Sequence, residues 1–480
     1  MKKLSLNIKL FYGLGMASRG IKDGLFQLFL FFYFSQVLGL APELAGLSSL
    51  VALGFDAISD PLVGLISDKW QSKKWGRRHP FLFVSALPLG VFTWLLFAPP
   101  EGLEQTGLFW WLTIFAILVR FALTLFNVPY ISLGAELSSD YKERTLITAI
   151  RLMFATLFPV IVMIVGYVYY FVPTEEYSNG LLNKGAYPTF ALLCGVLMVI
   201  IIVTSAWGTR KAIPNLPQPS AYQNQLTSRQ LLSSLSAAFK MTSFRSLVIF
   251  NMLLYIGLGV GIIFSPYFGP YYFGFAAQEM AVLPISSAIG GFLSLIIAPS
   301  LGDKLGKKGT TLWSALIAGL FFALPYNLRM LGFFPENGTS SILPIYVVTL
   351  IIAYTALVMA LSLVASMMAD VVDEFELKTG NRQEGLFFSM MSFAYKMTTG
   401  VGTFIAGLLL AWIQFPKQAD VADVAQSAID GLGLVGGPIV LSFFVLSVFF
   451  IIPYPITKAR FQEIRGRLDE KSNKKYDAEI

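Results

Sequence analysis

Residues 44–67 read LAGLSSLVALGFDAISDPLVGLIS, an apolar stretch long enough to cross a membrane. Its only charged residues are Asp56 and Asp60. An ionised carboxylate near the middle of a bilayer costs roughly 3 kcal/mol or more, so such residues face a cavity or a partner. At a spacing of i, i+4 the two side chains share one helix face, about 6 Å apart. Two carboxylates held together in a dry site gain from a bound cation or proton, so the pair predicts an ion-coupling site.

The composition of the chain is that of a membrane protein. Of its 480 residues, 55% are hydrophobic and 13% are charged, whereas a soluble domain carries about 25% charged residues. One cysteine (Cys194) and one histidine (His79) exclude a disulfide framework and argue against a Cys/His metal site. The start, MKKLSLNIK, leads into a long apolar segment without a small-residue cleavage site, so we expect no cleavable signal peptide.

Twelve apolar segments recur along the chain, each near or above the roughly 20 residues that span hydrocarbon. They are 10–36, 44–67, 80–99, 107–136, 146–171, 187–208, 244–269, 280–302, 310–329, 343–369, 384–414 and 433–456. Most of the 35 Lys and Arg residues lie at the termini and in the loops after even-numbered segments. By the positive-inside rule we predict an all-α, multi-pass protein of the inner cell membrane with both termini cytoplasmic. The net charge of +7 therefore reflects topology rather than nucleic-acid binding.

A long loop divides the twelve segments into six and six. We predict four parts: a six-helix bundle (1–208), a cytoplasmic linker (209–243), a second six-helix bundle (244–456) and a charged cytoplasmic tail (457–480). The linker begins IPNLPQPSAYQNQ and continues SRQLLSSLSAAFKM, whose apolar residues recur at helical spacing. We expect an amphipathic helix at the inner membrane surface, with a merely solvated linker as the alternative.

The two halves repeat each other at their cytoplasmic turns. The chain reads GLISDKW and WGRRHP after the second segment, and PSLGDKLGKKGT after the eighth; SLGAELSSDYKERT after the fourth is echoed by SMMADVVDEFELKTGNRQEG after the tenth. Two such halves resemble the major facilitator superfamily, in which substrate binds near mid-membrane between the halves. We expect an ion-pair gate on the inner face, the alternative being simple positive-inside anchoring. The turn residues that could form inter-helix salt bridges are Asp68, Lys69, Arg77 and Arg78, with Asp303, Lys304, Lys307 and Lys308 as their echo. Of these, we assign Asp68, Arg77, Arg78, Asp303 and Lys304 to the gate.

Polar side chains inside the apolar segments outline a candidate site. Asp56, Asp60 and Thr124 offer the hard oxygen ligands that Na⁺ requires, with Ser59 or Asn127 completing the set. Lys396, from the other half, could compete with the cation for the carboxylates or form a permanent salt bridge with them. The residues expected at the substrate site are Arg19, Lys22, Asp23, Arg120, Asn127, Arg151 and Lys396.

Several motifs resemble those of the glycoside–pentoside–hexuronide cation symporters, which include the melibiose permeases and the animal sodium–lysophospholipid symporter. They are YGLGMASRGIKDGLFQLFLFFYFSQVLGL, FDAISDPLVGLISDK, WGRRHPF, NVPYISLGAEL and DYKER. The resemblance implies that Asp56 and Asp60 bind the coupling cation and that Thr124 is a ligand. It implies that Ser59 replaces an Asn. It also implies that Lys396 is the lysine of the eleventh helix, that Arg151 is linked to the sugar site, and that Arg382 joins the cytoplasmic gate.

The departures from this pattern concern the substrate. The melibiose permeases have Lys-Asp where this chain has Arg19-Gly20, and an aspartate where it has Asn127. The intramembrane charges comprise five cations (Arg19, Lys22, Arg120, Arg151 and Lys396) and three anions (Asp23, Asp56 and Asp60). A positive surplus favours an anionic substrate such as a uronate, but a neutral sugar is equally compatible.

We therefore expect a secondary transporter that couples a cation, Na⁺ or otherwise H⁺, to symport of a sugar, glycoside or uronide by alternating access. The alternatives are sodium-coupled transport of a lysophospholipid or other amphiphile, and a non-transporting receptor or scramblase. The sequence contains no Ser/His or metal-ligand pattern of the kind expected in an enzyme, so we do not expect enzymatic activity. We expect no cofactor besides the coupling ion, Na⁺ at Asp56 and Asp60. The expected partners are a small-molecule substrate and membrane lipids but no nucleic acid, and the expected state is a monomer.

Overall fold

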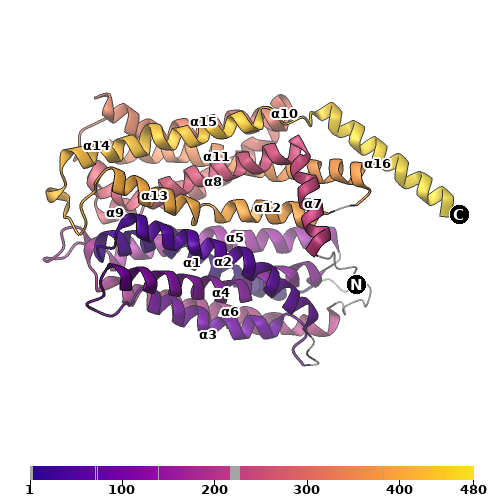
Figure 1. Ribbon diagram of the computed structural model, residues 1–480, viewed down its shortest axis with the longest axis horizontal. Coiled ribbons are helices and arrows are strands. Elements are labelled where there is room, and N and C mark those ends of the chain that lie inside the picture. Colours follow the sequence, from indigo (N-terminus) through magenta and orange to yellow (C-terminus); the bar gives the residue numbers. More distant parts are fainter. Residues whose placement is uncertain are drawn as a thin grey trace. The chain divides into compact units, whose positions relative to one another are not determined.

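The computed structural model describes residues 4–70, 72, 74–138, 140–216, 228–381 and 383–479, which form helices joined by short loops (Figure 1). No β-strand occurs among these residues, so the all-α prediction is confirmed for them. A backbone in hydrocarbon has no water to bond, and a helix satisfies its N–H and C=O groups within the segment. The predicted apolar segments therefore become helices.

The elements follow one another with few long connections. The first part of the chain forms α1 (Leu6–Gly24), η1 (Leu25–Leu30), η2 (Tyr33–Val37), α2 (Pro42–Lys69), α3 (His79–Leu96), α4 (Gln105–Leu137), α5 (Tyr141–Val165), η3 (Gly166–Tyr170), η4 (Gly180–Leu182), α6 (Ala186–Thr209) and η5 (Arg210–Asn215). The rest forms α7 (Ser228–Lys240), α8 (Thr242–Tyr267), η6 (Phe268–Phe273), α9 (Ala277–Met280), α10 (Leu283–Met330), α11 (Ile342–Thr379), α12 (Glu384–Lys396), α13 (Val401–Trp412), η7 (Val421–Asp423), α14 (Gln426–Leu434), η8 (Val435–Ile439), α15 (Val440–Ile451) and α16 (Lys458–Glu479).

Local chemistry sets several of the helix ends. Pro42 opens α2, where its missing N–H costs nothing. The Asp140 side chain caps α5 by accepting a hydrogen bond from the Glu143 N–H at 2.9 Å. Gly380 ends α11 with φ of 75°, a left-handed conformation that glycine adopts without strain. These caps place the charged turns at the ends of the long apolar helices.

Within the described residues, ten helical segments are long and apolar enough to cross a membrane. One of them, Ala277–Met330, contains two predicted spans, 280–302 and 310–329, and is interrupted at Gly306, where φ is 71° and ψ is 162°. The predicted span 10–36 corresponds to α1 with η1 and η2 and is not among the ten. The count of twelve spans therefore stays a prediction.

The chain forms two compact units. Unit 1 consists of Met1–Gln223, Ile262–Ile285 and Thr399–Ile429, and unit 2 consists of Asn224–Gly261, Ser286–Thr398 and Asp430–Ile480. In unit 1, α1 packs against α5 and α6, α3 against α4 and α6, and α2 against α4 and α13. In unit 2, α11 packs against α12 and α16. The predicted division into 1–208, 209–243, 244–456 and 457–480 stays a prediction.

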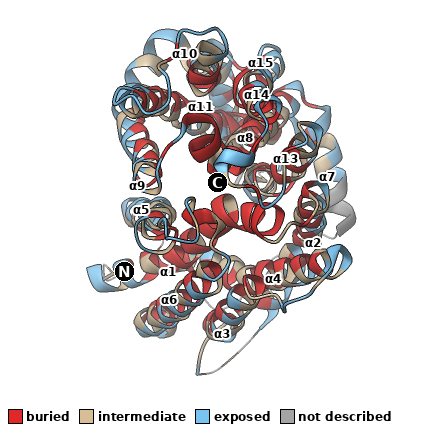
Figure 2. Cartoon of the chain, turned by 90° about the vertical axis from the view of Figure 1, so that its left-hand side faces the viewer, coloured by how far each residue is buried: buried red, intermediate tan, exposed pale blue. Residues whose placement is uncertain are grey.

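Helix α1 lies inside unit 1 and is buried along most of its length beyond Tyr12 (Figure 2). Its buried side chains include the charged residues Lys22 and Asp23, which have relative exposures of 5% and 8%. Lysine and aspartate are almost never buried unless they are paired. Lys22 and Asp23 are therefore expected to have charged partners inside unit 1.

Candidate functional site

An aspartate and a threonine from neighbouring helices of unit 1 form the centre of the candidate cation site. The Thr124 hydroxyl on α4 donates a hydrogen bond to Asp60 Oδ1 on α2 at 2.8 Å. Pro61 follows Asp60 inside α2 and has no N–H, so the Ala57 carbonyl lacks its usual helical donor. Packing of α2 on α4, with the Phe55 and Phe121 rings in edge-to-face contact, holds the two side chains together.

The neighbouring serine provides a further oxygen. Ser59 is 3% exposed, and its Oγ has no hydrogen-bond partner among the described residues. A buried hydroxyl without a partner is unfavourable unless a ligand or an unseen group satisfies it. Carboxylate and hydroxyl oxygens are the donors that hard cations prefer, so Asp56, Ser59, Asp60 and Thr124 fit a small cation such as Na⁺. No group of three or more His, Cys, Asp or Glu side chains in the described part of the chain could hold a metal.

Asp56 is paired with an arginine of α4. Arg120 Nη1 lies 2.7 Å from Asp56 Oδ2, and the two side chains are only 4% and 5% exposed. Arg120 Nη2 also donates to Thr399 Oγ1 at 3.1 Å, where Thr399 stands between α12 and α13. Sequence reasoning placed Arg120 at the substrate site, whereas the structure gives it a carboxylate of the candidate cation site as its partner.

The charges of α1 form a second group beside this pair. Asp23 forms ion pairs with Arg19, at 3.5 Å, and with Lys22, at 3.1 Å. Lys22 also lies 4.6 Å from the centroid of the Phe26 ring and interacts electrostatically with Arg120 and Asp56. One carboxylate thus serves two cations, which leaves this group with a net positive charge.

The two other predicted residues of unit 1 lie in different surroundings. Arg151 on α5 interacts with the Tyr12 hydroxyl, and the Tyr12 ring stacks on Tyr130 with centroids 4.5 Å apart. Asn127, one turn beyond Thr124 on α4, is half-buried, and its Oδ1 has no hydrogen-bond partner in the described part of the chain. Arg151 therefore belongs to an aromatic cluster on α1 and α4, a surrounding that the sequence did not indicate.

Lys396 belongs to unit 2, where it is the last residue of α12 and is half-buried. The helical segment is interrupted at 397–400 before α13 begins at Val401. Interrupted helices are frequent at the binding sites of transporters because they expose backbone groups. The predicted competition of Lys396 with a cation at Asp56 and Asp60 stays a prediction.

Ion pairs join the charged turn after α2 to the end of α4. Arg78 contacts Asp68 at 2.7 Å and Glu136 at 2.8 Å, and Arg77 contacts Glu136 at 2.7 Å. Gly76, with φ of 64°, makes the turn that presents both arginines. Sequence reasoning named Asp68, Arg77 and Arg78 but missed Glu136. The repeat containing SLGAEL and SMMADV could have indicated it, because both copies hold an acidic residue at the same place.

The corresponding turn of unit 2 uses one of the expected turn residues, Lys307, but neither of the two that were assigned to the gate. Asp303 and Lys304 are exposed, and no ion pair involves either of them among the described residues. The ion pair instead joins Lys307, just after Gly306, to Asp370 at 2.6 Å. Lysine after the turn glycine and an acid on the facing helix thus repeat the arrangement of unit 1. The remaining predicted gate residue, Arg382, lies outside the described residues.

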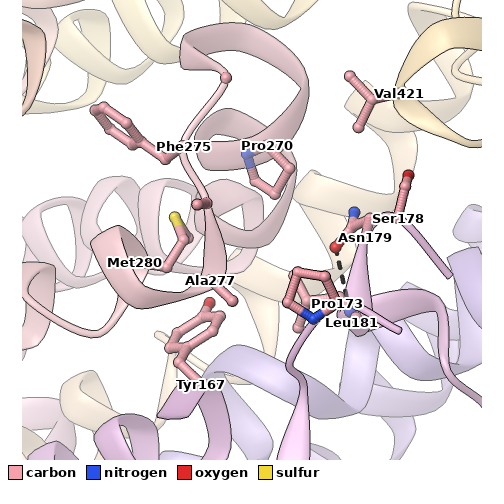
Figure 3. A pocket seen from close by; sticks show the side chains of 13 residues that line it. Tyr167, Pro173, Ser178, Asn179, Leu181, Pro270, Phe275, Ala277, Met280 and Val421 are labelled. Atoms are coloured by element: carbon pink, nitrogen blue, oxygen red, sulfur yellow. Dashed lines mark hydrogen bonds between the residues drawn. The ribbon is translucent and has the colours of Figure 1, made fainter. Parts of the chain in front are cut away.

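Unit 1 also contains a pocket of about 250 Å³ away from the charged residues (Figure 3). It is lined by segments around Pro173, Pro270 and Val421, together with Tyr167 and Met280. The Tyr167 hydroxyl is buried and has no hydrogen-bond partner among the described residues. None of the predicted site residues lines this pocket, so it is separate from the candidate cation site.

Comparisons with known proteins place these features in context. A family model for MFS/sugar transport proteins matches residues 11–458. The isoprimeverose transporter of Lactiplantibacillus pentosus is 25% identical, with 87% of this chain and 81% of that protein covered. The glucuronide carrier protein homolog of Escherichia coli K12 is 24% identical, with 96% and 94% covered. The sodium-dependent lysophosphatidylcholine symporter 1 of Gallus gallus is 24% identical, with 98% and 90% covered.

Solved structures resemble the fold at low sequence identity. A bacterial homolog of the human lysosomal transporter Spinster, in an inward-facing and unoccupied conformation, matches with a TM-score of 0.66. Its sequence is 13% identical, and 96% of this chain and 97% of that chain are covered. This likeness concerns the fold alone.

Proposed function

Because this chain belongs to the MFS/sugar transport protein family, the glycoside–pentoside–hexuronide:cation symporters of the major facilitator superfamily, we propose that it couples Na⁺ to symport of a sugar, glycoside or uronide. The members of this family are membrane transporters and not enzymes. The chain is accordingly a multi-pass secondary transporter with a small-molecule substrate. Our proposal adds the identity of the coupling ion, the class of the substrate and the orientation of the protein in the membrane.

The observation that carries the proposal is the oxygen cluster on α2 and α4. Asp60 accepts a hydrogen bond from the Thr124 hydroxyl at 2.8 Å. The buried hydroxyl of the neighbouring Ser59 has no hydrogen-bond partner among the described residues. A Na⁺ ion at Asp60 would satisfy the Ser59 oxygen and neutralise a carboxylate in a site of low dielectric. Symport needs such a site, because ion binding has to lower the free energy of the substrate-bound state.

The charge balance of α1 supports an anionic sugar as the substrate. Arg19 and Lys22 share one carboxylate, Asp23, and the Arg19 side chain is 21% exposed. A uronate carboxylate could form a two-point contact with the Arg19 guanidinium. The similarity to the glucuronide carrier protein homolog agrees with this choice. A neutral glycoside would instead bind through hydrogen bonds alone.

We further propose that transport follows alternating access across twelve spans, with both termini in the cytoplasm. Excess Lys and Arg at the termini and even-numbered loops supports this orientation. In it, the ion pairs of Arg77, Arg78 and Glu136 lie on the inner side, where they would break as that side opens. The protein would act as a monomer within the lipid, with Arg382 adding to the same gate.

Lysophospholipid symport is the second candidate. The chicken lysophosphatidylcholine symporter matches 98% of this chain at an identity close to that of the sugar transporters, so similarity alone does not separate the two. A sugar substrate requires polar contacts from the charged residues of α1, whereas a lysolipid also requires a groove for its acyl chain. Binding assays with uronates and with lysolipids would distinguish them.

The decisive experiment is accumulation of a radiolabelled uronide in proteoliposomes under an imposed Na⁺ gradient. The wild-type protein should concentrate the substrate, and Asp60→Asn should abolish accumulation while leaving the protein folded in detergent. Glu43→Gln, an exposed acidic residue at the start of the same helix, should transport normally. If Asp60→Asn still concentrates substrate against its gradient, Asp60 does not bind the coupling ion.

A further inference from the structure

We propose that Arg120 is an internal cation that competes with Na⁺ for Asp56 and thereby sets the affinity of the coupling site. The inference rests on the proposed function, since it concerns the same ion. It assigns to Arg120 a role in ion selectivity instead of substrate binding. The guanidinium occupies Asp56 when Na⁺ is absent, and Na⁺ binding displaces it.

The contacts of Arg120 place it in direct competition. Its Nη1 lies 2.7 Å from Asp56 Oδ2, so the guanidinium occupies a position at that oxygen where a Na⁺ ion could otherwise bind. Both side chains are almost fully buried, at 4% and 5% exposure. Asp60 lies one helical turn from Asp56 and accepts a hydrogen bond from Thr124, so the two carboxylates belong to one site, in which Arg120 is the cation in direct contact with Asp56.

The geometry also shows why Arg120 can be displaced. A guanidinium binds a carboxylate most strongly through two parallel N–H···O bonds. Only Nη1 of Arg120 bonds Asp56, and its buried Nε has no hydrogen-bond partner in the part of the chain that the structure describes. A buried N–H without an acceptor retains much of its desolvation cost. The pair is therefore strong enough to form in the absence of Na⁺ but weaker than a two-point ion pair.

The charges around Asp56 and Asp60 affect how tightly the site binds Na⁺. Two ionised aspartates alone would present two negative charges to Na⁺, and the guanidinium of Arg120, in contact with Asp56, offsets one of them. Removing the guanidinium should therefore tighten Na⁺ binding, because electrostatic attraction is poorly screened at a buried site. A permanent structural salt bridge predicts the reverse, since its loss would leave Asp56 less well positioned and Na⁺ binding unchanged or weaker.

Thr399 connects this competition to a helix interruption. Arg120 Nη2 donates to Thr399 Oγ1 at 3.1 Å, and Thr399 lies in the break between α12 and α13. When Na⁺ displaces Arg120 from Asp56, the guanidinium cannot keep both of its present contacts. Ion binding would thus alter a contact at the break, a place where the helix is already free to change its direction.

The test is calorimetric titration of Na⁺ into purified protein, with choline chloride keeping the ionic strength constant. Arg120→Gln should bind Na⁺ at least tenfold more tightly than the wild-type protein. Arg120→Lys keeps the charge and should stay within threefold of it. Arg245→Gln removes an exposed arginine near the start of α8, which has no part in the candidate site, and should leave the Na⁺ dissociation constant within twofold.

A second variant covers the case in which Arg120→Gln fails to fold. Thr399→Val keeps every charge but removes one contact of the guanidinium, so Na⁺ should bind two- to fivefold more tightly. If the wild-type protein and Arg120→Gln bind Na⁺ equally, the inference is wrong while Na⁺ coupling stands. If neither binds Na⁺, both the inference and the proposed coupling ion are overturned. Measurable binding by Arg120→Gln alone supports the inference.

Discussion

At the scale of single residues, Thr124 illustrates how a hydroxyl can shape the candidate cation site. Its Oγ1 donates to Asp60 Oδ1, an arrangement that orients the carboxylate and leaves the hydroxyl's lone pairs for a cation. Thr124→Val removes the hydroxyl at nearly constant volume. We expect it to raise the Na⁺ dissociation constant about 10- to 150-fold, which corresponds to the roughly 1.5–3 kcal/mol of one hydrogen bond to a charged group. Calorimetric titration measures this change directly.

Thr113 on the same helix gives the matched control. Its hydroxyl donates a hydrogen bond to the Phe109 carbonyl of its own helix at 2.7 Å and to no carboxylate among the described residues. Thr113→Val should therefore leave the Na⁺ dissociation constant within twofold of the wild-type value. Equal effects of the two substitutions would mean that Thr124 acts on helix stability and has no part in binding the ion.

At the scale of elements, the contact of α2 with α13 depends on glycine. A Cβ atom on Gly46 would lie 2.9 Å from Phe404 Cα, closer than real Cβ contacts come, and 3.0 Å from the Thr403 carbonyl oxygen, tighter than most such contacts. Small residues permit such close helix packing inside membranes. Gly46→Val should separate the two helices, lower the melting temperature and reduce substrate transport at least tenfold. Proteoliposome uptake and thermal unfolding check the two effects.

Gly54 on the same helix provides the control for this prediction. No atom lies within 4 Å of a Cβ built there, so Gly54→Val changes the helix propensity equally but meets no neighbour. Its uptake rate should stay within twofold of the wild-type rate. A similar loss in both variants would assign the effect to valine in the helix and remove the argument for close packing.

At the scale of the whole molecule, the two units carry equivalent ion pairs at equivalent turns. Glu136 pairs with Arg77 and Arg78 in unit 1, and Asp370 pairs with Lys307 in unit 2. Both acids are less than 15% exposed. Glu136→Gln and Asp370→Asn should each lower the unfolding free energy by about 1–3 kcal/mol, because each leaves a partly buried cation unpaired. Thermal unfolding in detergent measures the loss.

The double variant tests whether the two pairs are independent. The pairs share no residue, so their effects on the melting temperature should add. Glu43→Gln, an exposed acid, should have no measurable effect. A double variant no less stable than either single variant would show that the two turns act as one network.

Much of the helical fold was predictable, and particular residues show why. A segment such as 44–67 has to be helical in hydrocarbon, because its backbone has no other way to satisfy its polar groups. Contacts between residues close in sequence also follow from helix spacing: Arg19 and Asp23, at i, i+4, form an ion pair. The turn glycines Gly76 and Gly306 were visible as repeated motifs, and both adopt positive φ.

Partners distant in sequence were predicted less well. Asp303 and Lys304 were expected in the gate, yet Lys307 forms the ion pair because the chain turns at Gly306 and presents the following residue to Asp370. Glu136 was missed because its partners, Arg77 and Arg78, are separated from it by a whole helix. Helix periodicity gives the face of a residue but does not give the rotation of one helix against another.

The sequence by itself determined that the chain is a helical membrane protein and that Asp56 and Asp60 share a helix face, while its motifs indicated a transporter by resemblance. Burial of charge is so costly in hydrocarbon that composition and spacing alone imply the membrane helices and a function for the two aspartates. Only the tertiary structure decided that the two carboxylates differ, Asp60 bonding Thr124 and Asp56 bonding Arg120. The reason is physical: which donor reaches which acid depends on the packing of α2 on α4, within distances of a few ångströms that no spacing along one helix specifies.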